Sequence, residues 1–195
     1  MAFGEAGALP SSCTGRRPPE NLPEIEQLGR VLVARESLED LLQRVADAAV
    51  RTISRCDSAS VSMADDGRVS TWVSTDDAAE RADTHQYGSD EGPCLDAIRS
   101  GSAHFVDSLA RDVRWPKFSP RAVDEGMVSL YSLPLSVDEE TVGALNLYSR
   151  SKPFAYPDLQ TAEALASQAA VTLANAQAYH ELRGKLERCE ETQTD

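Results

Sequence analysis

Two strand-turn-strand patterns are the feature that most constrains the fold of this chain. In residues 59–73, apolar and polar residues alternate on both sides of the turn Asp65-Asp66-Gly67. In residues 128–148, two longer apolar runs flank the acidic turn Asp138-Glu139-Glu140. Period-two alternation around a tight turn is typical of a β-hairpin, whose strands are antiparallel. The sequence therefore predicts an antiparallel sheet with residues 142–148, apolar on both faces, as its central strand.

The strand expected over residues 128–137 is irregular. Apolar residues stand at 128 and 130 and then at 133, 135 and 137, so the alternation slips near Ser132. Pro134 lies beside this slip, and proline cannot donate a backbone hydrogen bond to a neighbouring strand. The pattern predicts a bulge or an edge position here. A shorter strand is expected over residues 103–107.

Helical periodicity brackets the strands. One helix is expected over residues 25–32 and a second after Ser37 as N-cap. A long third helix begins at Pro157 and is expected to extend to about Glu190. The buried stripe expected for the second helix comprises Leu38, Leu41, Leu42, Val45, Ala49 and Ile53. The heptad-like seam of the third comprises Leu159, Ala162, Ala166, Ala169, Leu173 and Ala176. The fold class is therefore α+β, a sheet of about five strands with the terminal helices on one face.

Charge and cysteine content narrow the function. The 195 residues include 32 acidic and 19 basic side chains, a formal net charge of −13. Such a chain repels phosphate backbones and anionic membranes, so direct binding to nucleic acid or to a membrane is not expected. Four cysteines without close pairing, and no apolar run of the length of a membrane span, favour a reduced cytoplasmic location.

Three separated motifs resemble those of a GAF domain. They are Gln86-Tyr87 with Glu91-Gly92-Pro93-Cys94-Leu95-Asp96-Ala97-Ile98, then Asp107, Asp112, Arg114-Trp115-Pro116 and Phe118, then Leu133-Pro134-Leu135 with Gly143-Ala144-Leu145-Asn146-Leu147. The resemblance covers roughly residues 24–180. More narrowly, the sequence resembles the actinobacterial type of GAF domain, which usually precedes an RNA-binding module called an ANTAR domain. Proline and glycine content with little apolar periodicity predicts a disordered arm over residues 1–23. The expected domains are then this arm, a GAF domain over 24–180 and a helical extension over 181–195.

The resemblance implies an antiparallel sheet of five or six strands with a ligand pocket on the face opposite the terminal helices. It also implies a sensory module, because GAF domains bind small molecules such as cyclic nucleotides, tetrapyrroles, haem or 2-oxoacids. The ligand and any cofactor stay unknown, because no residue pattern indicates haem or a bilin. Since the sequence ends at Asp195, without room for an ANTAR module, we expect a sensor that acts through protein contacts or one that lacks its output domain.

Cys94 is a candidate site residue with two interpretations. A helix is expected from Pro93 to Ser100, closed by Gly101, which places the thiol at a helix N-terminus, where the helix dipole favours the thiolate. Buried cysteines are also common packing residues, and the neighbouring Leu95 favours this structural role. Redox activity or ligand contact is the alternative.

Further candidate ligand-binding residues are aromatic or polar: Gln86, Tyr87, Trp115, Phe118, Tyr131 and Asn146. Together with Cys94 they could line a mostly apolar pocket with a few directional polar groups. Alternatively, Trp115 anchors its loop onto the sheet. Asn146 lies in the central strand, where a buried amide must find a partner, either a ligand or the neighbouring loop.

Other polar residues point to structural roles. His85, His104 and His180 are isolated, so no metal site is expected. Asp107 and Asp112 are expected to form ion pairs with Arg111 and Arg114 that stabilise their loop. The acidic residues before Gly92 are expected to be solvated.

The sequence therefore favours a non-enzymatic sensory module. A small molecule or a redox state would change the pocket, and the long C-terminal helix would pass that change to a homodimer partner or an effector protein. Two alternatives stay open. One is a thiol enzyme similar to the free methionine-R-sulfoxide reductases, which needs two neighbouring cysteines. The other is a dimerisation scaffold without a ligand.

Overall fold

A computed structural model describes the backbone of residues 38–191 and the side chains of residues 38–179. The expected arm 1–23, the expected helix 25–32 and the N-cap Ser37 lie outside the described residues. No helix of the described part is long and apolar enough to cross a membrane.

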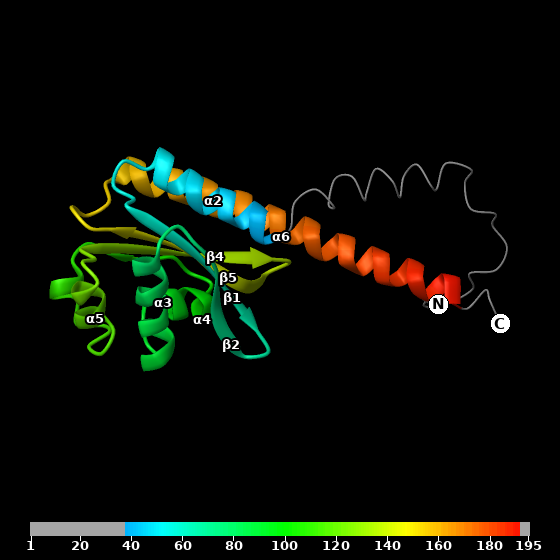
Figure 1. Ribbon diagram of the computed structural model, residues 1–195, viewed down its shortest axis with the longest axis horizontal. Coiled ribbons are helices and arrows are strands. Elements are labelled where there is room, and N and C mark those ends of the chain that lie inside the picture. Colours follow the sequence, from blue (N-terminus) through cyan, green and yellow to red (C-terminus); the bar gives the residue numbers. More distant parts are fainter. Residues whose placement is uncertain (1–37, 192–195) are drawn as a thin grey trace, which may run out of the picture. The chain divides into compact units, whose positions relative to one another are not determined.

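The five described strands form one antiparallel sheet in the order β2-β1-β5-β4-β3 (Figure 1). Their bounds are β1 Ser58–Asp65, β2 Arg68–Ser74, β3 His104–Val106, β4 Ser129–Val137 and β5 Glu140–Ser149. β5 is central, as its apolar faces predict, and pairs with β1 on one side and β4 on the other.

Both predicted turns close two-residue hairpin loops. Asp66 and Gly67 have φ values of 46° and 74°, and Asp138 and Glu139 have 49° and 69°. Positive φ at both central residues matches the right-handed twist of the flanking strands, and Asp and Gly adopt it readily. Asp65 therefore pairs with Arg68 across the first loop.

The irregularity of β4 is at a different place from the predicted one. The register between β4 and β5 is regular around Ser132, which pairs with Asn146, and it shifts between Leu135 and Ser136. The apolar alternation breaks at Ser132 because a buried serine occupies a position where an apolar residue was expected. The edge position predicted for Pro134 is confirmed, because β3 is short and pairs only with Leu130–Ser132 of β4.

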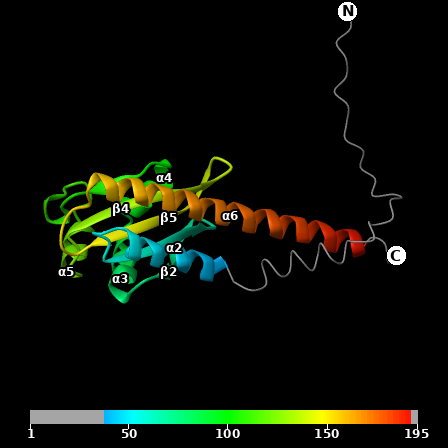
Figure 2. The same ribbon diagram turned by 90° about the horizontal axis from the view of Figure 1, so that it is seen from above.

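Helices cover both faces of the sheet (Figures 1 and 2). On one face, α2 (Leu38–Thr52) lies beside the first part, up to Tyr179, of α6 (Tyr156–Glu191). α3 (Asp77–Ser89), α4 (Pro93–Ser100) and α5 (Ser119–Asp124) lie on the other, with the 3-10 turn η1 (Leu109–Arg111). α6 begins and ends within one residue of its predicted bounds.

The main apolar core lies between the sheet and the pair α2 and α6. Of the stripe expected on α2, Leu42, Val45, Ala49 and Ile53 are buried, whereas Leu38 and Leu41 are only partly buried. The seam of α6 from Ala162 to Leu173 joins the same core. Small residues let this helix approach its neighbours closely, so the seam packs within the chain and is not a free surface.

Candidate functional site

The face of the sheet that α3 and α4 cover buries a group of polar side chains, here called the polar cluster. Its members are Ser60 and Ser62 of β1, Thr71 of β2, Ser132 of β4, Asn146 and Tyr148 of β5, Asp83, Gln86 and Tyr87 of α3, and Cys94 of α4. Thr71 and Tyr87 are partly buried and the other eight are buried. The β1 serines, which alternate with apolar residues, therefore face a second interior layer and not solvent.

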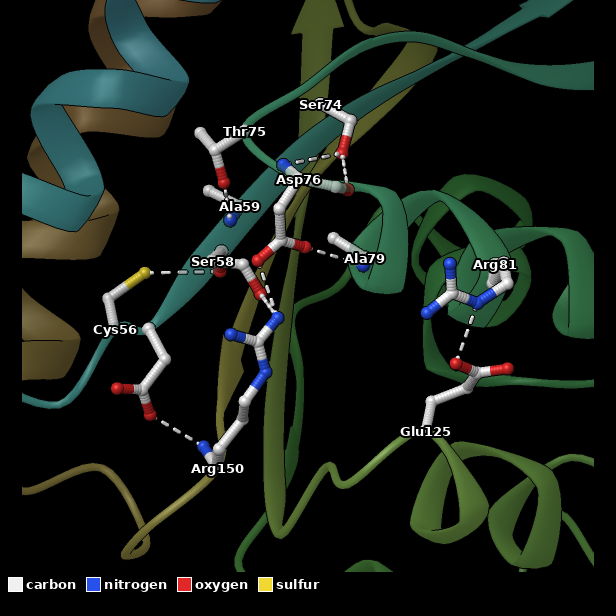
Figure 3. A network of polar contacts seen from close by, with 11 residues as sticks. Cys56, Ser58, Ala59, Ser74, Thr75, Asp76, Ala79, Arg81, Glu125 and Arg150 are labelled. Carbon is white, nitrogen blue, oxygen red and sulfur yellow. Dashed lines mark hydrogen bonds and ion pairs between the residues drawn. The ribbon is translucent and has the colours of Figure 1, made fainter.

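α3 is fixed in place by contacts at its N-terminus and in its N-terminal half. Asp76 caps the helix by accepting a hydrogen bond from Ala79 N at 2.9 Å, and its other carboxylate oxygen binds Arg150 at 2.5 Å (Figure 3). Arg81 forms an ion pair of 2.8 Å with Glu125, which follows α5 (Figure 3). These contacts orient the inner face of α3, where residues 83, 86 and 87 are spaced at i, i+3 and i+4.

Asp83 is the acidic centre of the polar cluster. Its Oδ1 accepts hydrogen bonds from Tyr148 Oη at 2.5 Å and Asn146 Nδ2 at 3.1 Å, and its Oδ2 accepts one from Thr71 Oγ1 at 3.0 Å. Within residues 38–179, Asp83 forms no ion pair with a basic side chain. Burial raises the pKa of Asp83 to about 6, although the hydrogen bonds oppose this shift.

Asn146 joins three strands and α3. Its Oδ1 accepts a hydrogen bond from Ser132 Oγ at 2.8 Å. Its Nδ2 donates to Ser62 Oγ at 2.9 Å and to Asp83 Oδ1 at 3.1 Å. Ser60 Oγ is a more distant acceptor at 3.3 Å. Side chains of the neighbouring strands and α3, and not the expected loop, satisfy this amide.

Cys94 lies at the predicted N-terminus of α4, and Gly101 caps the helix as expected. The Cys94 side chain is fully buried, and its backbone N donates a hydrogen bond to Gln86 Oε1 at 2.8 Å. Burial raises the pKa of the Cys94 thiol to about 12, so desolvation outweighs the helix dipole. A neutral, packed thiol supports the structural interpretation of this residue.

We expect alkylation to separate a packed thiol from an activated one. In the folded protein at pH 8, Cys94 should react with iodoacetamide at least about a thousandfold more slowly than an ordinary thiol, because so little thiolate is present. Peptide mapping by mass spectrometry measures the modified fraction with time, and urea-unfolded protein is the control. Modification of Cys94 in the folded protein at the unfolded rate would contradict this assignment.

An open groove of about 480 Å³ adjoins the polar cluster. It lies between the β1–β2 turn and the corner of α3 and α4. Its lining residues are Ala64, Gly67, Arg68, Val69, Tyr87, Asp90, Leu95, Ile98 and Arg99. Tyr87 belongs to both the groove and the polar cluster, because its hydroxyl contacts Ser62 Oγ at 2.7 Å and Thr71 Oγ1 at 2.9 Å.

Comparison with known proteins identifies the family. The sequence model of the GAF domain matches residues 35–174, most of the chain. This chain belongs to the GAF domain family. No curated protein sequence matches it significantly.

Solved structures share the fold of this GAF domain. A domain from a protein described as a two-component sensor histidine kinase of Sinorhizobium meliloti has 19% identity and a TM-score of 0.62, covering 76% of this chain and 98% of its own. The GAF domain region of a protein described as a membrane protein of Geobacter sulfurreducens has 22% identity and the same TM-score, covering 76% and 97%. A type II free methionine-R-sulfoxide reductase of Thermoplasma acidophilum has 14% identity and a TM-score of 0.56, covering 71% and 96%.

Several residues that carry the GAF resemblance connect helices to one another. Glu91 Oε1 accepts backbone hydrogen bonds from Lys117 and from Phe118, the latter at 2.9 Å. Trp115 Nε1 donates to Asp96 Oδ2 of α4 at 2.8 Å. The guanidinium of Arg114 lies 4.3 Å from the centre of the Trp115 ring. Trp115 and Phe118 therefore anchor their loop, and Phe118 is fully buried in the apolar cluster beside α5.

The loop ion pair is confirmed for Asp112 with Arg114, whose groups approach to 2.5 Å. This contact lowers the pKa of Asp112 against the opposing effect of burial. Arg114 also donates a hydrogen bond of 2.9 Å to the Phe105 carbonyl of β3. Asp107 is exposed, and no ion pair links it to Arg111 among the described contacts.

Three candidate residues of the GAF domain are not brought to the polar cluster: Trp115 and Phe118, which anchor the loop before α5, and Tyr131. Tyr131 is on the opposite face of β4, in the core beside α6, where its hydroxyl donates to Glu163 at 3.2 Å. Strand alternation explains the separation, since its neighbour Ser132 is the residue that faces α3. Cys56 belongs to the same opposite core, so the described cysteines do not form a pair of neighbouring thiols.

The described histidines, His85 and His104, lie apart from each other and contact different residues. His85 contacts Glu125 at 3.3 Å, and His104 stands edge-on to Trp115. His180, like Cys13 and Cys189, falls outside the described side chains. Among the described residues, no group of three or more His, Cys, Asp or Glu side chains could hold a metal ion.

The sequence did not indicate the acidic centre of this GAF domain. The acidic residues before Gly92 were expected to be solvated, which is wrong for Asp83, because its side chain is fully buried. The i, i+3 and i+4 spacing of Asp83, Gln86 and Tyr87 could have revealed a shared polar face. Ser60, Ser62, Thr71, Ser132 and Tyr148 were also missed, because alternating serines in a strand usually indicate a solvated face.

Proposed function

We propose that this GAF domain is a non-enzymatic sensory module that binds a small polar molecule in the groove beside Tyr87. The observation that carries the proposal is that the groove and the buried polar cluster share this residue. Apolar walls with a few directional polar groups are typical of small-molecule sites. Arg68 in the groove lining favours a ligand with an acidic or strongly hydrogen-bonding group, whereas Arg99 there is already paired with Asp90.

A route from the site to α6 supports regulation as the outcome. Ser132 and Asn146 face the polar cluster, whereas their neighbours Leu133, Leu145 and Leu147 pack in the core that includes α6. Interiors are densely packed, so a shift of β4 or β5 on one face must be accommodated on the other. Binding beside α3 would thereby alter the packing of α6.

The proposed function includes a protein partner that contacts α6. A homodimer through the terminal helices, or an effector protein, would receive the change from α6. Because the seam residues Ala162, Ala166, Ala169 and Leu173 are buried within the chain, such a contact needs another surface of α6, where Val171 is 52% exposed. The sensor histidine kinase named above is consistent with a signalling role, and the relation to the GAF domains that usually precede an ANTAR domain stays a prediction.

The neutral thiol of Cys94 argues against the reductase-like alternative. Catalysis by cysteine requires a thiolate, and burial opposes its formation here. Cys56, the other described cysteine, has its pKa likewise raised to about 12 by burial and lies in the other core.

Native mass spectrometry and thermal unfolding with a panel of nucleotides, amino acids and 2-oxoacids test this proposal. We expect a bound mass or a ligand-induced stabilisation, which reaches about 2.7 kcal/mol at a ligand concentration one hundred times Kd. Ile98→Trp should fill the groove and abolish the effect. Val123→Trp, in a separate surface groove beside α5, is the matched control and should keep it.

Two results would overturn this function. Absence of any bound mass and of stabilisation by every compound would favour a scaffold without a ligand. Binding that persists in Ile98→Trp would place the ligand outside the groove.

A further inference from the structure

A chain of hydroxyl groups connects the groove to the buried carboxyl of Asp83. Tyr87, which lines the groove, places its Oη 2.9 Å from Thr71 Oγ1. Thr71 Oγ1 lies 3.0 Å from Asp83 Oδ2. Each hydroxyl can donate one hydrogen bond and accept others, so the direction of the whole chain can reverse. Such a chain can carry a proton without displacing a heavy atom.

In the part of the chain that the structure describes, the surroundings of Asp83 supply hydrogen bonds but no ion-pair partner. On α3 itself, Glu80 disfavours the charged form, and Arg81 and His85 are directed to Glu125. Neutral groups face Asp83 from the other elements: Tyr148 and Asn146 of β5, Ser60 of β1, Thr71 of β2, and Cys94 of α4 with its neutral thiol. The charged carboxylate is therefore held by dipoles alone, and a proton would neutralise it.

We propose that Asp83 is a proton-binding site of this domain, which protons reach from the groove through the hydroxyls of Tyr87 and Thr71. The charge state of Asp83 sets how firmly α3 holds to the sheet. A hydronium ion in the groove gives a proton to Tyr87 Oη. Tyr87 passes its own hydroxyl proton to Thr71, and Thr71 passes its proton to Asp83 Oδ2. One proton enters, both hydroxyls keep one proton each, and water is released. This inference stands independently of the proposed small-molecule ligand.

Asp83 has a pKa of about 6 in the folded protein, compared with an ordinary value of 3.8 for aspartate. This difference sets the direction of the effect on stability. The pKa is raised by folding, so the contribution to stability is complete below pH 3.8 and is lost as the pH rises through 6. This one site should therefore increase the unfolding equilibrium constant about a hundredfold between pH 3 and pH 7. A fall in pH in the groove would tighten α3 against the sheet.

Carbon-13 NMR of protein labelled at the aspartate carboxyls tests the site directly. We expect one carboxyl to titrate near pH 6 in the full chain and to be missing in Asp83→Asn. Asp138→Asn, at an exposed turn position whose positive φ suits asparagine, is the matched control and should leave that resonance unchanged. Thr71→Val should raise the midpoint, because it removes a donor to the charged form.

The same titration also tests the proton route through Tyr87 and Thr71. Tyr87→Phe keeps the ring and removes the hydroxyl, so it should slow proton exchange at Asp83 at least tenfold and broaden the resonance near its midpoint. Urea unfolding of wild type and Asp83→Asn should show a difference that grows with pH. Titration of Asp83 near pH 4 would overturn the proton site, and unchanged exchange in Tyr87→Phe would overturn the route.

Discussion

Replacing Gly92 with alanine is expected to lower the free energy of unfolding by about 4 kcal/mol, from backbone strain and overpacking together. Gly92 has φ of 145°, a conformation that residues with a side chain rarely adopt. A Cβ there would lie 2.6 Å from Gln86 Cγ. Gln86 cannot yield easily, because its side chain accepts from Cys94 N at 2.8 Å and donates to Tyr148 Oη at 3.4 Å. Chemical denaturation in urea measures the loss.

Gly88→Ala is the matched control for this prediction. Gly88 lies in the last turn of α3, and no atom outside the adjacent backbone of this helix lies within 4 Å of an added Cβ. Alanine in a helix interior should be neutral or stabilise by about 0.5–1 kcal/mol, because glycine loses more conformational freedom on folding. Equal effects of the two substitutions would show that the Gly92 backbone is not constrained as described.

The second large effect is expected at Asn146, where leucine should lower the free energy of unfolding by about 4 kcal/mol. Leucine has a similar size, so the loss does not come from a cavity. It comes from the buried partners left behind: Ser132 loses its acceptor, and Asp83 and Ser62 lose a donor. An unpaired buried polar group costs about 1–3 kcal/mol, and more if it is charged.

The same exchange at an exposed position controls for the change of residue type. Asn175 lies on the exposed side of α6, and Asn175→Leu should change the free energy of unfolding by less than about 0.5 kcal/mol. Urea denaturation at pH 7 compares the two variants. If Asn146→Leu were as stable as Asn175→Leu, the polar cluster would not contribute to the stability of the fold.

Burial explains why parts of the site could be predicted and others could not. Asn146 was predicted to be buried because apolar residues flank it in a strand that is apolar on both faces. Asp83 was missed because its neighbours in sequence, Glu80, Arg81 and Thr84, are exposed and give the segment a polar composition. Only the inner face of α3 is buried, and one buried acid does not alter the average of an otherwise polar helix.

The sequence by itself determined the two hairpins with their antiparallel pairing and the helices α2, α4 and α6. Period-two alternation, the turn residues and the helical seam of α6 are local properties that the backbone must follow. The tertiary structure decided which face of each strand meets which helical layer. It therefore separated Tyr131 from Ser132 and placed Asp83 against Asn146, 63 positions apart in the chain. The alternation in the sequence shows only that neighbouring residues of a strand point to opposite faces of the sheet. The packing of α3 on one face and α6 on the other decides which face carries the polar cluster.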